Sequence, residues 1–131
     1  MKRIYLFFSQ LLIAGVIISS CTDDKYDLLQ GTWERVNVED INDPYRYEWV
    51  FQDGELTMYR ISKEDPSDVS IRNSGYYSLE VNPLGTGLVL SNTSNSTWND
   101  KWDVIKLDNE QLIINLEITG GIILREFVKK P

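Results

Sequence analysis

The sequence predicts an all-β protein, built as a single eight-stranded up-and-down antiparallel barrel over residues 31–131. From Gly31 onward, apolar and polar residues alternate with a period of two, which is typical of strands that bury one face. Turn-forming residues interrupt this alternation at short intervals, and no stretch sustains the 3.6-residue period of a helix. Many short strands at regular spacing indicate a barrel or a sandwich, and the loop lengths decide between the two.

Four strands are predicted in the first half of the domain, over residues 32–38, 45–51, 55–62 and 75–81. One face of the second strand carries an aromatic row made of Tyr45, Tyr47, Trp49 and Phe51. Asp53 and Gly54 follow this strand, and both tolerate a positive φ angle, so they predict a two-residue hairpin turn into the third strand. The apolar face of the fourth strand carries Tyr77.

The second half contains four more predicted strands, over residues 88–91, 102–107, 111–118 and 122–129. Glycine-rich or Asp-Asn turns separate them at residues 84–87, 108–109 and 120–121. The loops alternate in length, because the connections over 39–44, 63–74 and 92–101 are long and those between them are short. An up-and-down order places the three long loops together at one end of a barrel, which we call the mouth, and leaves a plain floor. A Greek-key sandwich would not sort its loops in this way.

The first 20 residues have the layout of a signal peptide. Met-Lys-Arg precedes an apolar run over residues 4–18, which is shorter than the roughly 20 residues that span a membrane. The stretch Ile18-Ser19-Ser20-Cys21 resembles the lipobox of bacterial lipoproteins. That resemblance implies cleavage before Cys21, lipidation of its thiol, and a tether over residues 21–30. The acidic residues that follow resemble the export signal of Bacteroidetes surface lipoproteins, which implies anchoring in the bacterial outer membrane, with possible exposure at the cell surface.

Gly31-Thr32-Trp33 matches the Gly-x-Trp motif of lipocalins and related calycins. Together with YEWVFQDGELTMY and the final REFVKK, it resembles the lipocalin-like lipoproteins of Bacteroidetes. The resemblance implies a lipocalin-like barrel in which Gly31 and Trp33 form a structural motif. It also implies a basic residue of the last strand that caps Trp33, and both Arg125 and Lys129 are candidates.

Composition excludes several classes of function. The net charge is −7, and it becomes −9 when Lys2 and Arg3 leave with the signal peptide, which argues against nucleic acid as a partner. The chain has no histidine and one cysteine, so histidine-based catalysis and histidine metal sites are excluded. No phosphate-binding glycine loop or calcium loop is present. We therefore expect a protein that is not an enzyme, with no cofactor and no metal.

The candidate ligand-binding residues are the aromatic row with Met58, Tyr77 and Trp98. The row has two interpretations, because its side chains either line a cavity for an apolar or amphipathic ligand or simply fill the barrel. Trp98 lies in a long polar loop, where it predicts contact with a sugar ring or a partner protein, or else folds over the mouth. The sequence thus predicts a membrane-anchored lipoprotein that binds a small molecule or glycan at its mouth. The alternative is an interaction or inhibitor lipoprotein that uses the same loops with a filled barrel.

Overall fold

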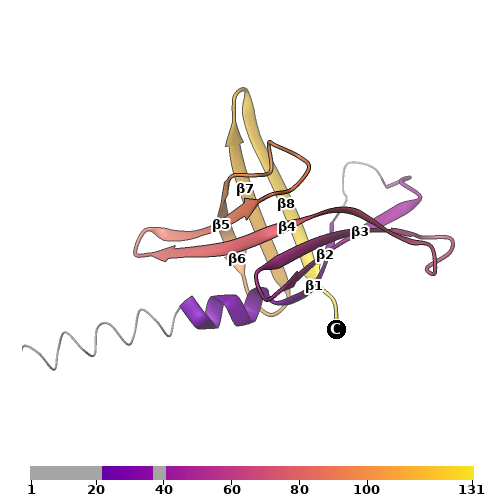
Figure 1. Cartoon of the computed structure of the whole chain (residues 1–131), viewed down its shortest axis with the longest axis horizontal. Coiled ribbons are helices and arrows are strands. Elements are labelled where there is room, and N and C mark those ends of the chain that lie inside the picture. The colour runs from indigo at the N-terminus through magenta and orange to yellow at the C-terminus, as the bar shows by residue number, and fades with distance from the viewer. Residues whose placement is uncertain (1–21, 37–40) are drawn as a thin grey trace, which may run out of the picture.

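The computed structural model describes residues 22–36 and 41–131, and it confirms the predicted all-β barrel. The strands are β1 (Gly31–Arg35), β2 (Tyr45–Gln52), β3 (Glu55–Ser62), β4 (Val69–Asn82), β5 (Gly85–Ser91), β6 (Lys101–Leu107), β7 (Gln111–Ile118) and β8 (Gly121–Lys129). Each strand pairs antiparallel with the next, and β8 pairs with β1, so the sheet closes in up-and-down order (Figure 1). This is the architecture that the resemblance to lipocalins implied.

The largest departure from the expected strands is β4, which begins at Val69 rather than at residue 75. Residues 69–74 pair with β3, so the connection before β4 shortens from the expected 63–74 to 63–68. The sequence did not reveal this pairing because the alternation of Val69 and Ile71 with polar residues is short and ends at the polar pair Asn73 and Ser74. The mouth is therefore bordered by a longer β3–β4 hairpin instead of a third long loop.

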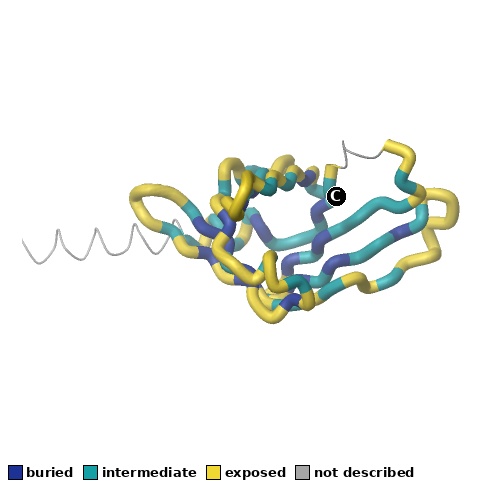
Figure 2. The backbone as a smooth tube through the Cα atoms, turned by 90° about the horizontal axis from the view of Figure 1, so that it is seen from above, coloured by how far each residue is buried: buried dark blue, intermediate teal, exposed yellow. Residues whose placement is uncertain are grey.

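The lower half of the barrel, toward the floor, is filled by side chains. The largest fully buried ones are Trp33, Trp102, Phe51, Phe127, Leu29, Leu56, Leu88, Leu90, Leu112 and Ile114. Phe51 meets Tyr77 edge to face, with 5.0 Å between the ring centroids. Figure 2 shows the buried segments within the strands and the exposed segments at the turns. For Phe51 and Tyr77, the structure therefore supports the interpretation that the aromatic residues fill the barrel.

Residues 22–29 form a helix, where the sequence led us to expect an extended tether over 21–30. The helix packs on the floor, because Leu29 is fully buried in the core and Tyr26 packs against it. The hydroxyl of Tyr26 accepts a hydrogen bond of 2.8 Å from the backbone N–H of Leu79, at a point where β4 has run past the end of β3. The helix thus supplies a hydrogen-bond partner for a strand edge that would otherwise lack one, and the packed domain begins before Gly31.

Lys129 is the basic residue that caps Trp33. Trp33 and Lys129 are direct partners across the β1–β8 pairing, and the Lys129 Nζ lies 4.9 Å from the centroid of the Trp33 ring. The same ammonium donates hydrogen bonds to the carbonyl oxygens of Leu28, at 2.8 Å, and Gln30, at 2.7 Å. Arg125 is paired with Ile114 instead, nearer the mouth, and donates to the carbonyl of Leu124. The register therefore decides between the two candidates that the sequence left open.

We expect the substitution Lys129→Met to lower the free energy of unfolding by about 1–3 kcal/mol, the usual cost of leaving buried hydrogen-bond partners unsatisfied. Methionine keeps the apolar stem but gives no donor to the carbonyls of Leu28 and Gln30. Denaturant unfolding, followed by tryptophan fluorescence, measures the loss. The matched control is Lys130→Met, whose ammonium pairs with Glu34 at 3.0 Å on a surface about one-third exposed, where ion pairs contribute about 0–1 kcal/mol. Equal losses in both variants would contradict the role of Lys129.

Candidate functional site

A pocket of about 420 Å³ lies at the mouth, between the mouth ends of β1 to β4 and the loop that joins β5 to β6. Its lining residues are Arg35, Tyr47, Trp49, Met58, Tyr59, Arg72, Asn73, Ser94, Asn95 and Trp98. Its volume falls within the roughly 300–1,000 Å³ range of ordinary ligand pockets. The barrel is thus filled toward the floor and hollowed toward the mouth.

The bottom of the pocket is apolar. Trp49 and Met58 are almost fully buried, with exposed fractions of 2% and 3%. The ring of Trp98 packs on Trp49 at a centroid distance of 5.6 Å, and Phe127 supports Trp49 from below at 4.8 Å. A ligand that enters the mouth therefore meets aromatic and thioether surface that the core already holds in place.

The loop over residues 92–100 is held by its own side chains. Asn99 Oδ1 accepts two hydrogen bonds from Thr93, one from the backbone N–H at 2.8 Å and one from the Thr93 hydroxyl at 2.7 Å. The backbone N–H of Trp98 donates to the carbonyl of Asn95, and the Trp98 carbonyl accepts from Trp102 Nε1 at 3.1 Å. These bonds hold the backbone at Trp98, and its ring packs on Trp49, so this part of the pocket is formed before any ligand arrives.

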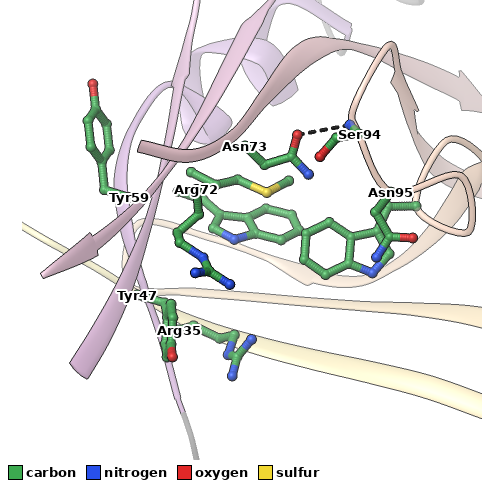
Figure 3. Close-up of a pocket in the computed structure, with 10 residues that line it drawn as sticks. Arg35, Tyr47, Tyr59, Arg72, Asn73, Ser94 and Asn95 are labelled. Carbon is green, nitrogen blue, oxygen red and sulfur yellow. Dashed lines mark hydrogen bonds between the residues drawn. The ribbon is translucent and has the colours of Figure 1, made fainter. Parts of the chain in front are cut away.

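Glycine at position 75 allows this loop to approach β4. A Cβ atom there would lie 2.5 Å from the carbonyl oxygen of Ser91 and 2.8 Å from Thr93 Cγ2. On the same strand, Asn73 Oδ1 accepts a 3.0 Å hydrogen bond from the backbone N–H of Ser94, as Figure 3 shows. The loop is therefore seated on β4 by close backbone contact and by one side-chain bond.

The rim of the pocket carries two guanidinium groups. The Arg35 guanidinium lies 4.8 Å from the centroid of the Tyr47 ring. Figure 3 shows Arg35, Tyr47 and Arg72 gathered on one side of the pocket, whereas the ring of Tyr59 points away from them. A cation stacked on an aromatic face keeps its N–H groups available at the edge of the guanidinium plane.

Tyr47 also holds a carboxylate at the rim. Its hydroxyl donates a 2.9 Å hydrogen bond to Asp43 Oδ2, and the backbone N–H of Tyr45 donates to Asp43 Oδ1. Burial raises the pKa of the Tyr47 hydroxyl, the bond to Asp43 raises it further, and Arg35 and Arg72 act in the opposite direction. The phenol is protonated at neutral pH, as an ordinary tyrosine is, and it donates its hydroxyl proton to Asp43.

The structure brings together Tyr47, Trp49, Met58 and Trp98 of the predicted ligand-binding set. Phe51 and Tyr77 are buried lower in the barrel and do not line the pocket. Tyr45 lies at the mouth but outside the lining, where its ring packs under the Arg60 guanidinium at 4.3 Å. The aromatic row therefore divides between core and pocket along its length.

Six lining residues were not identified by sequence reasoning: Arg35, Tyr59, Arg72, Asn73, Ser94 and Asn95. For Arg35 a signal was present, because it follows Trp33 by two residues and so shares the inward face of the same strand. Arg72 and Asn73 were assigned to a loop, and their position depends on the extension of β4.

The signal peptide predicted over residues 1–20 and the predicted lipidation site Cys21 lie outside the described residues. Among residues 22–36 and 41–131, no helix has the length and apolar character needed to cross a membrane. Within those same ranges no three residues of the metal-ligating types His, Cys, Asp and Glu come together as a possible metal site. Comparison of the chain with protein-family models, with curated proteins and with solved structures found no match.

We expect Gly75→Ala to displace the loop over 92–100, because the added methyl group would overlap a backbone oxygen rather than a flexible side chain. Overpacking of this kind costs about 1–3 kcal/mol in stability. Denaturant unfolding measures that loss, and iodide quenching of tryptophan fluorescence measures the added exposure of Trp98. The control is Gly121→Ala, since a Cβ atom there meets nothing within 4 Å. A Gly75→Ala protein that is as stable and as protected from iodide as the control would contradict the close seating of the loop.

Proposed function

We propose that this protein is a membrane-anchored bacterial lipoprotein that binds a small amphipathic molecule, or the apolar face of a glycan, in the pocket at its mouth. The observation that carries the proposal is the pocket of about 420 Å³ with Trp49, Met58 and Trp98 as its apolar bottom. A concave apolar surface with a few polar groups at its rim is the usual form of a small-molecule site. The fixed loop over 92–100 lowers the entropic cost of binding, because little of the wall must be ordered by the ligand.

Binding is proposed rather than catalysis because of the residue types in the lining. The ten lining residues include no carboxylate, no cysteine and no histidine. Those groups supply most nucleophiles and general bases in enzymes. The polar residues that are present, such as Asn73, Ser94 and Asn95, suit hydrogen bonds to a bound molecule.

The anchoring part of the proposal rests on the lipobox resemblance at Cys21 and on the position of the helix that follows it. This helix packs on the floor of the barrel through Tyr26 and Leu29. A lipid on Cys21 would therefore join the protein to the membrane at the floor side. The pocket would then open away from the bilayer, toward molecules that arrive from solution.

A second candidate is an interaction or inhibitor lipoprotein that presents its mouth to a partner protein. The observation that favours it is a group of exposed aliphatic side chains on the segments around the mouth. Ile41 is 80% exposed on the β1–β2 connection, and Ile71 and Val69 at the start of β4 are 64% and 49% exposed. Exposed apolar groups of this kind are common where proteins dock.

Replacement of Cys21 by alanine tests the anchor. We expect the protein to move from the membrane fraction to a soluble or uncleaved form, because one substitution removes the only thiol in the chain. Fractionation followed by immunoblotting of the native host's cells measures this, with a Ser20→Ala variant as the control that keeps a small residue before the cysteine. Unchanged membrane fractionation of Cys21→Ala, with normal processing, would refute the lipoprotein assignment.

Native mass spectrometry of the lipidated protein, purified from its own membrane, tests the pocket. We expect a bound small molecule on the wild-type protein and on the control Ile105→Ala, whose side chain is 58% exposed on β6. The adduct should be lost or strongly reduced in Trp98→Ala, because that variant loses part of the apolar bottom. An adduct that persists unchanged in Trp98→Ala would place the ligand elsewhere, and a co-purified protein without a small molecule would favour the second candidate.

A further inference from the structure

The mouth pocket has a charge opposite to that of the protein as a whole. The chain carries a net charge of −7. The lining, in contrast, contains two arginines and no acidic residue. A local reversal of charge in a concave site raises the local concentration of ions of the opposite sign, which here are anions. The two arginines in the pocket are therefore better explained by the charge of a bound ligand than by the solubility of the protein.

Several basic side chains on the outside of the sheet are matched to a carboxylate. Arg46 pairs with Glu48, Lys101 with Glu80, Lys106 with Asp108 and Lys130 with Glu34. Within the described ranges 22–36 and 41–131, neither Arg35 nor Arg72 has such an ion pair, and Arg60 has none either. Position sets Arg35 and Arg72 apart, because both line the mouth pocket whereas Arg60 stacks on Tyr45 outside it.

A bulge in the sheet turns Arg72 toward the pocket. Met58 pairs with Asn73 and the next residue of β3, Tyr59, pairs with Ile71, so Arg72 is the extra residue of β4 at this register shift. Bulges re-aim a side chain and are common beside binding sites. The side chain joins Arg35 and Tyr47 at one side of the pocket (Figure 3).

The two guanidinium groups act on the same region. Both lie close enough to the Tyr47 hydroxyl to oppose the rise in its pKa. The nearest acid, Asp43, lies outside the lining and already accepts hydrogen bonds from Tyr45 and Tyr47. Among the described residues whose charges act on Tyr47, the two positive charges of Arg35 and Arg72 stand against the one negative charge of Asp43. The Tyr47 hydroxyl donates its single proton to Asp43, so an anion placed beside Tyr47 would be bound by the two guanidinium edges.

We propose that the ligand of the mouth pocket is a carboxylate with a flat apolar body, whose anionic group binds Arg35 and Arg72 and whose body rests on Trp49, Met58 and Trp98. This inference rests on the proposed small-molecule function and names its ligand class. Guanidinium groups bind carboxylates through paired, charge-assisted hydrogen bonds, which favours arginine over lysine for this task. The aromatic bottom favours a flat body, because ring faces and ring edges pack well on one another.

Three probes share a naphthalene body and differ in the charge of the head group. They are the anionic 2-naphthoate, the neutral 2-naphthamide and the cationic 2-naphthylmethylammonium. Each is titrated into the full lipidated protein in lipid nanodiscs by calorimetry, with empty nanodiscs as the blank. We expect naphthoate to bind at least about tenfold more tightly than naphthamide, since charge-assisted hydrogen bonds commonly contribute about that much. Naphthylmethylammonium should bind most weakly, and the preference for naphthoate should shrink as salt is added.

Single substitutions assign the preference to residues. Arg35→Gln and Arg72→Gln should each lower the affinity for naphthoate by about tenfold or more, and should change the affinity for naphthamide little. Arg60→Gln is the control, because its guanidinium stacks on Tyr45 outside the lining. Arg72 is exposed, so its substitution should leave the fold intact even if Arg35→Gln does not fold.

Each result separates this inference from the function on which it rests. The inference of an anionic ligand would be overturned if naphthamide bound as tightly as naphthoate, or if naphthylmethylammonium bound more tightly. The proposal of small-molecule binding would remain in either case. The same conclusion would follow if no probe bound but native mass spectrometry still found a small adduct. If no probe bound and only a protein partner were found, both the inference and the proposed function would fall.

Discussion

The pairing of β1 with β8, which closes the barrel, is reinforced at its floor end by one ammonium group. β1 is only five residues long, and its pairing with β8 runs from Trp33↔Lys129 to Arg35↔Phe127. At the floor end of this short seam, the Lys129 ammonium lies over Trp33 and binds the carbonyls of Leu28 and Gln30. The ammonium is partly buried, and this burial lowers the pKa of Lys129. Three parts of the chain meet there: the end of the helix, the first strand and the last strand.

The side chains beside the β1–β8 pairing also determine which part of the barrel is filled and where the pocket begins. Trp33 and Phe127, both fully buried, fill the space beside it, and Phe127 supports Trp49 from below. Above Trp49, β1 ends with the inward-facing Arg35, and no further bulky apolar side chain of β1 follows within the described residues. The pocket therefore begins where the apolar side chains of the seam end. β2 shows the same transition, because Phe51 and Trp49 are buried whereas Tyr47 is only partly covered.

The local sequence pattern was sufficient to predict most strands of the barrel, but it did not predict most residues that line the pocket. Trp49 and Phe51 continue an aromatic row at every second position, flanked by the polar residues Glu48 and Gln52, so their burial on one face of a strand was predictable. In residues 69–74 the two apolar side chains, Val69 and Ile71, are exposed and the other four residues are polar, so no buried apolar face marks a strand there. The bulge at Arg72 arises from pairing between β3 and β4, which no local pattern encodes. Arg125 and Lys129 lie on the same face of one strand, four residues apart, and only the register with β1 distinguishes them.

The helix over 22–29 has a mechanical consequence. Any pull applied through the chain ahead of residue 22 reaches the helix first, and is passed to the barrel through Tyr26, Leu29 and the contacts of Lys129. These contacts lie between the applied force and β1, so they bear the load before any strand can peel from the sheet. Force therefore reaches the floor end of the β1–β8 pairing through the side chains of the helix and of Lys129 as well as along the backbone into Gly31.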